Sequence, residues 1–138
     1  MVIFLAKISL SEVLQLDISN SSIKKIDAFL ASEVEYSDPY MKALAYKYYI
    51  EHKLGNSLEA VNVLVKYIKN LNILTPYSII AISDSLIQIL LDLNNFDEAY
   101  KYIQLKKNFL PVSKLNLYLK DMITYLLKKD SINKQKIY

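Results

Sequence analysis

Cysteine and arginine are absent from this 138-residue sequence, which also holds only one glycine, one histidine and three prolines. Without cysteine there can be neither a disulfide framework nor a thiolate metal site, which fits a reducing compartment. One histidine supplies too few soft ligands for a zinc or copper site. One glycine excludes the glycine-rich loops that cradle nucleotide phosphates and disfavours sheet-rich folds. These absences favour helices joined by short loops, with no cofactor and no metal.

Long hydrophobic runs are also missing. The longest, residues 79–93, is interrupted by Asp84, Gln88 and Asp92 and is too short to span the hydrocarbon core of a membrane. The N-terminal sequence MVIFLAKISL is apolar, but it lacks the basic segment and cleavage site of a secretory signal. We therefore expect a cytoplasmic protein with no membrane partner.

The positive charge gathers in the last quarter of the chain. The net charge is +3, yet residues 101–138 hold nine lysines and only two acidic residues. These lysines, interleaved with tyrosines, are Lys101, Lys106, Lys107, Lys114, Lys120, Lys128, Lys129, Lys134 and Lys136. Lysine with stacking aromatic rings would bind nucleic acid without sequence preference, so nonspecific nucleic-acid binding is one alternative function. A solvated surface or a site for an acidic protein would use the same residues.

Capping residues mark the ends of the predicted helices. A capping side chain precedes a proline in Ser37-Asp38-Pro39 and in Thr75-Pro76, which indicates two helix starts. Gly55 and Asn94 stand where a helix end needs a left-handed residue. Together with the apolar spacing, these signals predict helices over residues 10–16, 23–35, 39–54, 58–71, 76–93, 96–109 and 114–129, then a short lysine-rich tail over 130–138.

Two helix–turn–helix segments resemble each other. The stretch GNSLEA at residues 55–60 aligns with NNFDEA at residues 94–99, an offset of 39 residues. The pattern resembles the tetratricopeptide repeat family, whose 34-residue unit has a small turn residue, an aromatic, an acidic pair, an alanine and a late proline. The fullest match, over residues 80–113, rests on Leu86, Asn94, Phe96, Asp97, Glu98, Ala99 and Pro111. Residues 41–74 form a degenerate unit, and a partial third begins near Lys114.

The resemblance implies a fold and a binding groove. It implies an all-α domain over residues 1–138, built as a right-handed stack of antiparallel helix pairs, an α-solenoid. In this family the first helices of the units line a concave groove that binds a protein or peptide. Carrying over those positions gives Lys42, Ala45, Tyr49, His52, Lys53, Asp84, Gln88, Leu91, Asp92, Tyr118, Met122 and Tyr125.

The expected function is a noncatalytic scaffold that binds a protein or peptide in this groove. The resemblance does not extend to the chaperone-tail binders of the family, because the groove has neither an inner asparagine nor an arginine. The carboxylates are scattered along the chain, so we do not expect an enzyme. Self-association is a third possibility, because the last helix lacks a polar outer face and a second copy could cover it in a homodimer.

Overall fold

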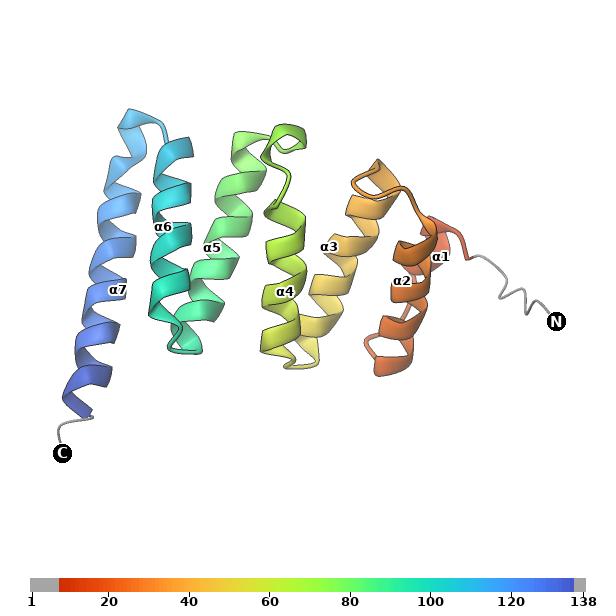
Figure 1. Cartoon of the computed structure of the whole chain (residues 1–138), viewed down its shortest axis with the longest axis horizontal. Coiled ribbons are helices and arrows are strands. Elements are labelled where there is room, and N and C mark those ends of the chain that lie inside the picture. The colour runs from red at the N-terminus through yellow and green to blue at the C-terminus, as the bar shows by residue number, and fades with distance from the viewer. Residues whose placement is uncertain (1–7, 136–138) are drawn as a thin grey trace. The chain divides into compact units, whose positions relative to one another are not determined.

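The computed structural model describes residues 8–135, which are α-helical throughout apart from short connections and two 3₁₀ turns (Figure 1). No β-strand occurs in this part of the chain, so the predicted all-α class is confirmed. The solenoid stacking stays a prediction. The α-helices are α1 (Leu10–Val13), α2 (Asn20–Ser32), α3 (Asp38–Lys53), α4 (Ser57–Ile68), α5 (Pro76–Asp92), α6 (Phe96–Phe109) and α7 (Leu115–Gln135).

The chain divides into two compact units, Met1–Lys69 and Asn70–Tyr138. The first contains α1 to α4 and the second contains α5 to α7. The boundary lies just before the 3₁₀ turn Leu71–Ile73, in the connection between α4 and α5. That the whole chain forms one domain stays a prediction.

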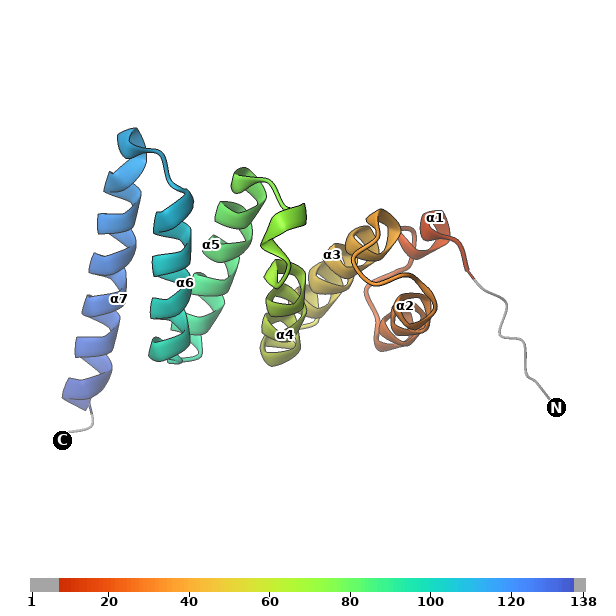
Figure 2. The same ribbon diagram turned by 45° about the horizontal axis from the view of Figure 1, so that its top comes forward.

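The N-terminal unit is built around α3, which packs against both α2 and α4, while α1 lies beside α2 and α3 (Figure 2). Apolar side chains spaced three and four residues apart meet in its core, as expected for amphipathic helices. One core cluster consists of Val13, Ile26, Phe29, Ala43 and Ile50. The hydroxyl of Tyr46 donates a hydrogen bond to the carbonyl of Leu16 and so holds the segment after α1 against α3.

The predicted starts of α3 and α5 and the turns that follow these two helices agree with the structure. Other bounds differ, because α1 ends at residue 13 and not 16, α2 covers 20–32 and not 23–35, and α4 ends at 68 and not 71. The side chains of Ser37 and Thr75 cap α3 and α5, each accepting a hydrogen bond from the backbone N–H three residues on. Gly55 has φ of +78° and Asn94 has φ of +58°, so both adopt the left-handed conformation expected of them. Tyr36 also has a positive φ, +64°, which the sequence pattern did not indicate.

In the C-terminal unit α6 packs against both α5 and α7 (Figure 1). Ile79, Leu86 and Leu90 of α5 are buried, as are Ala99 and Ile103 of α6. The core of this unit therefore lies along α5 and α6, and the side chains of α7 close one side of it.

The end of the chain differs from the prediction. A 3₁₀ turn, Val112–Lys114, precedes α7, and α7 continues past the predicted end at Lys129 to Gln135. An ion pair of 3.2 Å between Lys134 and Asp130, one turn apart, supports the added helical turn. Most of the predicted tail is thus helical. Its last residues, 136–138, and the apolar start, 1–7, lie outside the described part of the chain.

Candidate functional site

The groove positions predicted in the N-terminal unit lie together on one exposed face of α3. These are Lys42, Ala45, Tyr49, His52 and Lys53, and all five are exposed. The Lys53 ammonium lies 5.7 Å from the centre of the Tyr49 ring, a cation–π distance. Lys42 pairs at 3.0 Å with an aspartate one turn earlier. The structure shows an exposed strip of polar and aromatic side chains here.

In the C-terminal unit four predicted residues, Asp84, Gln88, Leu91 and Asp92, line a cleft of about 220 Å³. They form the α5 wall, and α7 forms the opposite wall. The complete lining is Asp84, Ile87, Gln88, Leu91, Asp92, Lys120, Asp121, Thr124 and Lys128. We call this the α5–α7 cleft. Its α7 residues were not among the predicted groove positions.

Lys106 of α6 joins the two walls. Its side chain is almost fully buried, and its ammonium lies 2.5 Å from a carboxylate oxygen of Asp84 and 2.7 Å from one of Asp121. The expectation that Lys106 belongs to an exposed basic surface was therefore wrong. Its position three residues after buried Ile103 was a signal of burial, because residues spaced by three or four share a helix face.

The carboxylates determine the protonation of Lys106. Burial by itself would lower the pKa of Lys106, but hydrogen bonds to Asp121 and Asp84 offset this effect, and the pKa is raised. The amine is therefore a fixed cation at neutral pH and does not act as a proton acceptor. One cation faces two carboxylates, so the three groups together carry a charge of −1.

A second ion pair joins the walls about two helical turns farther along α5 and α7. Lys128 lies 3.2 Å from a carboxylate oxygen of Asp92. Both side chains are substantially exposed, so this pair contributes little to stability. The two sets of charges nevertheless link α5 and α7 at both Asp84 and Asp92.

The last three predicted groove residues do not line the cleft. Tyr125 is buried, with its ring centre 6.2 Å from that of Phe96. Tyr118 accepts a hydrogen bond of 3.1 Å from the side chain of Gln104, and Met122 lies against the same amide. Tyr118, Met122 and Tyr125 thus pack α7 onto α6.

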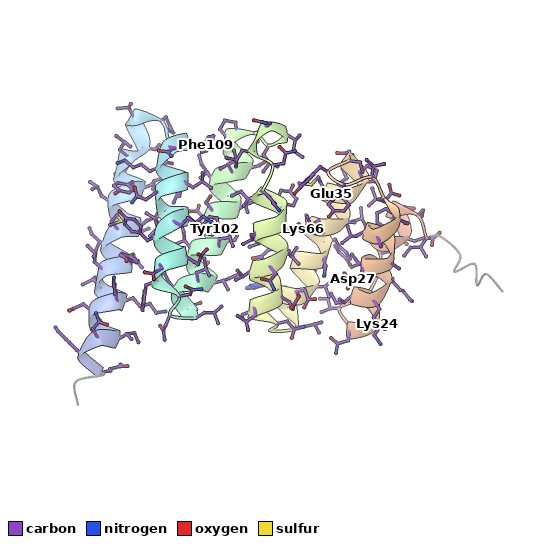
Figure 3. All side chains as sticks on the ribbon, viewed as in Figure 1. Lys24, Asp27, Glu35, Lys66, Tyr102 and Phe109 are labelled. Carbon is purple, nitrogen blue, oxygen red and sulfur yellow. The ribbon has the colours of Figure 1, made fainter. Side chains whose placement is uncertain are left out.

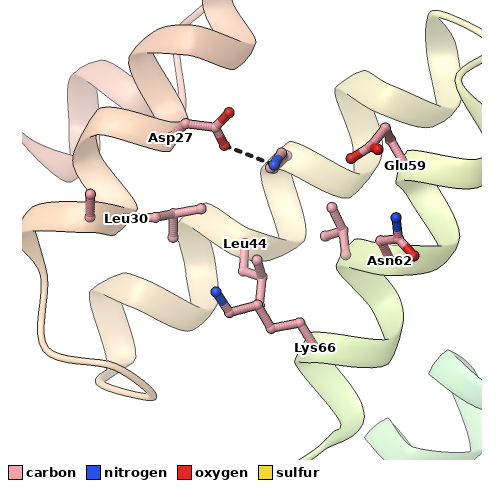
Figure 4. Close-up of a pocket in the computed structure, with 9 residues that line it drawn as sticks. Asp27, Leu30, Leu44, Glu59, Asn62 and Lys66 are labelled. Atoms are coloured by element: carbon pink, nitrogen blue, oxygen red, sulfur yellow. Dashed lines mark ion pairs between the residues drawn. The ribbon is translucent and has the colours of Figure 1, made fainter.

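The N-terminal unit has a cleft of its own, of about 300 Å³, which the sequence did not indicate (Figure 4). None of the predicted site residues lines it. Asp27 of α2 and Lys66 of α4 mark two of its sides (Figure 3), and Asp27 pairs with Lys47 of α3 at 2.8 Å. The full lining is Asp27, Leu30, Ala31, Leu44, Lys47, Glu59, Asn62, Val63 and Lys66.

Several lysines of the basic last quarter have partners within the fold. The Lys107 ammonium lies 4.6 Å from the centre of the Tyr118 ring, and the Lys129 ammonium lies 3.3 Å from the hydroxyl of Tyr125. The Lys101 ammonium lies 5.6 Å from the centre of the Tyr102 ring, and Tyr102 is labelled on α6 in Figure 3. The interleaved lysines and tyrosines therefore make cation–π contacts with one another. Lys136 lies outside the described residues.

Between residues 8 and 135 no three or more histidine, aspartate or glutamate side chains group as metal ligands would. Within the same range no helix combines the length and the apolar character needed to cross a membrane. The resemblance of residues 80–113 to the tetratricopeptide family stays a prediction. Comparison with protein-family models, curated proteins and solved structures finds no match to this chain.

Proposed function

We propose that this chain is a noncatalytic, tetratricopeptide-like domain that binds a protein or peptide, and that the α5–α7 cleft receives side chains of the ligand. The observation that carries the proposal is a cleft whose opposite walls are linked by Lys106. The predicted residues Asp84, Gln88 and Asp92 all lie on it.

The size and lining of the cleft suit one or two side chains of an extended segment. Ile87 and Leu91 are buried and supply apolar surface, while Gln88 and Thr124 bring amide and hydroxyl groups to the rim. Apolar surface with a few polar groups is the usual composition of a ligand site. At about 220 Å³ the cleft is smaller than most sites for drug-sized molecules, which favours side-chain capture.

The ion pairs favour binding over catalysis. Because Asp84, Lys106 and Asp121 hold one another, the walls are ordered before a ligand arrives, and binding loses less conformational entropy. The same contacts keep Lys106 charged, so the ammonium that links Asp84 and Asp121 holds structure and does not move protons.

The test is a selection of peptides from a random display library, followed by direct measurement of the affinity of the enriched peptides. Thr124→Trp would fill the cleft from the α7 wall. Asn108→Trp, at an exposed position of α6 outside the lining, is the matched control. We expect affinity to fall at least about tenfold with Thr124→Trp and to stay unchanged with Asn108→Trp. Equal affinity for both variants would contradict the proposal.

A further inference from the structure

The cleft of the N-terminal unit is formed by α2, α3 and α4, and we call it the α2–α4 cleft. Its apolar lining includes Leu44 of α3 and Val63 of α4, which are buried, and Leu30 of α2, which is partly buried. None of its lining residues belongs to the predicted groove or to the α5–α7 cleft. This cleft is therefore a separate candidate site, and its charges indicate what it could bind.

One pair of charges at the α2–α4 cleft is neutralised within the fold. The Lys47 ammonium lies 2.8 Å from a carboxylate oxygen of Asp27, and the Lys47 side chain is only 16% exposed. Because this lysine already has a carboxylate partner, the pair links α3 to α2 and adds no net charge to the cleft.

Two other charges at this cleft have no partner of opposite sign. Glu59 and Lys66, both on α4, are exposed, and neither forms an ion pair with any residue that the structure describes. Seven residues of α-helix separate their backbone positions by about 10 Å along the helix axis. The Lys66 ammonium lies 5.5 Å from the centre of the Tyr40 ring, and Glu35 acts on it only from beyond ion-pair distance. Both charges are thus available to a ligand.

The two charges lie at opposite ends of the cleft (Figure 4). Asp27 and Glu59 lie toward one end, and Lys66 lies toward the other. Leu30 and Leu44 lie between these ends. Since the charge of Asp27 is offset by its own ion pair, the first end carries a net charge of −1 and the second end a charge of +1. The cleft is apolar in the middle and oppositely charged at its two ends.

We propose that the α2–α4 cleft binds an extended polypeptide segment in which a basic and an acidic side chain stand two residues apart. Side chains two residues apart point to the same side of an extended chain, and their backbone positions are about 7 Å from each other. The aliphatic stems of lysine and glutamate cover the remaining distance and lie against the apolar lining. The basic group of the segment lies at Glu59 and its acidic group at Lys66. Asn62, between these two positions on α4, offers an amide to the backbone of the segment.

The exposure of the charged ends is the reason for choosing a chain segment as the occupant. A site for a small molecule usually encloses about 70–90% of its ligand. Here the Asp27 side chain is half exposed, and Glu59 and Lys66 are exposed as well, so a chain can cross the cleft and continue in both directions. The proposed function rests on a different cleft in the other unit, so this inference goes beyond it and can fail without it.

Titration of the isotopically labelled full chain with capped pentapeptides, followed by nuclear magnetic resonance, tests the site. The mixed probe is Gly-Lys-Ala-Glu-Gly, and the like-charged probes are Gly-Lys-Ala-Lys-Gly and Gly-Glu-Ala-Glu-Gly. We expect the mixed probe to shift amide signals within residues 27–31 and 59–66 and to bind at least about threefold more tightly than either like-charged probe. Salt is expected to weaken this binding, because the charges are exposed. Equal affinity for the three probes, or no shift at these residues, would overturn the proposal. Shifts at residues 84–92 and 120–128 alone would also overturn it, while supporting the proposed function.

A charge reversal tests the two ends separately from the rest of the chain. Lys66→Glu makes both ends acidic, so we expect the probe with two lysines to replace the mixed probe as the tightest ligand. Lys69→Glu is the matched control, because Lys69 is exposed at the end of the same helix but does not line the cleft. This control is expected to keep the wild-type order of the three probes. The wild-type order in Lys66→Glu as well would overturn the proposal.

Discussion

Lys106 connects three helices of the C-terminal unit through one ammonium group. Its stem lies in the core with Ile103, and its charge reaches Asp84 of α5 and Asp121 of α7. A buried charge is tolerated only when it is paired, so the lysine and the two carboxylates depend on one another. The burial of Lys106 was predictable from its spacing along α6. Its partners were not, because they are 22 and 15 residues away and meet it only when the three helices pack.

Replacing Lys106 with methionine keeps the shape of the side chain and removes its charge. The variant leaves Asp84 and Asp121 facing each other without a cation. Breaking a buried pair costs about 3–5 kcal/mol, but Asp84 is half exposed to water, so we expect a loss of about 2–3 kcal/mol in unfolding free energy. Urea denaturation measures it. Lys114→Met, at an exposed position, is the control, and an equal effect in both variants would contradict this role.

Asp17 makes the start of α2 sensitive to acid. It accepts hydrogen bonds of 2.5 Å from Ser22 and 2.9 Å from Ser19, and these hydrogen bonds, Ser22 first, lower the pKa of Asp17. A lowered pKa means that the ionised carboxylate stabilises the fold above the unfolded pKa of about 3.9. This contribution is lost as the pH falls through the lower pKa of the folded state.

Asp17→Asn keeps a hydrogen-bond acceptor but removes the titrating charge. We expect the variant to be less stable than the wild type at pH 6 and to lose less stability between pH 6 and pH 3. Urea midpoints at the two pH values, compared between the two proteins, measure the difference. The same acid dependence in the variant and the wild type would mean that Asp17 has no part in it.

At the scale of elements, the two turns at Gly55 and Asn94 are the features that the sequence predicted best. Both end a helix in the left-handed conformation, and local chemistry alone indicates this. The helix starts at Ser37 and Thr75 are local in the same way. The length of α7 was harder to predict, because it is apolar on two sides and its last turns carry no strong periodic signal.

The turn residues can be tested as a pair. The Cβ that Gly55→Ala adds would have no neighbouring atom within 4 Å, so the only cost is the left-handed backbone conformation. We expect this to lower the free energy of unfolding by about 1–2 kcal/mol. Asn94→Gly removes the smaller penalty that asparagine bears at the same conformation, so it should be neutral or slightly stabilising. Chemical denaturation of both variants measures this. A neutral Gly55→Ala would show that the turn can relax into another conformation.

At the scale of the whole molecule, the all-α class followed from the scarcity of glycine and from helical periodicity. The α5–α7 cleft did not follow in the same way. Its α5 wall was predicted from the repeat resemblance, but Lys120, Asp121, Thr124 and Lys128 depend on how α7 packs on α6. The cleft of the N-terminal unit left no sequence signal, because its lining comes from three helices without a shared motif.

The basic last quarter gives a prediction about nucleic acid. Lys106 is buried between carboxylates, and Lys128 and Lys134 are paired with aspartates, so fewer lysines are free for phosphates than the sequence suggests. We expect binding to a labelled single-stranded oligonucleotide to be weak, with a Kd no tighter than about 10⁻⁵ M at physiological salt, and to vanish as salt rises. Tight binding that resists salt would favour nucleic-acid recognition as the function.

The most direct test of the central claim is to map where a selected peptide binds by nuclear magnetic resonance on the labelled full chain. The account predicts that amide signals shift within residues 84–92 and 120–128, the two walls of the α5–α7 cleft, and that Thr124→Trp abolishes these shifts. Shifts confined to the exposed strip of α3 would contradict the claim that this cleft is the ligand site.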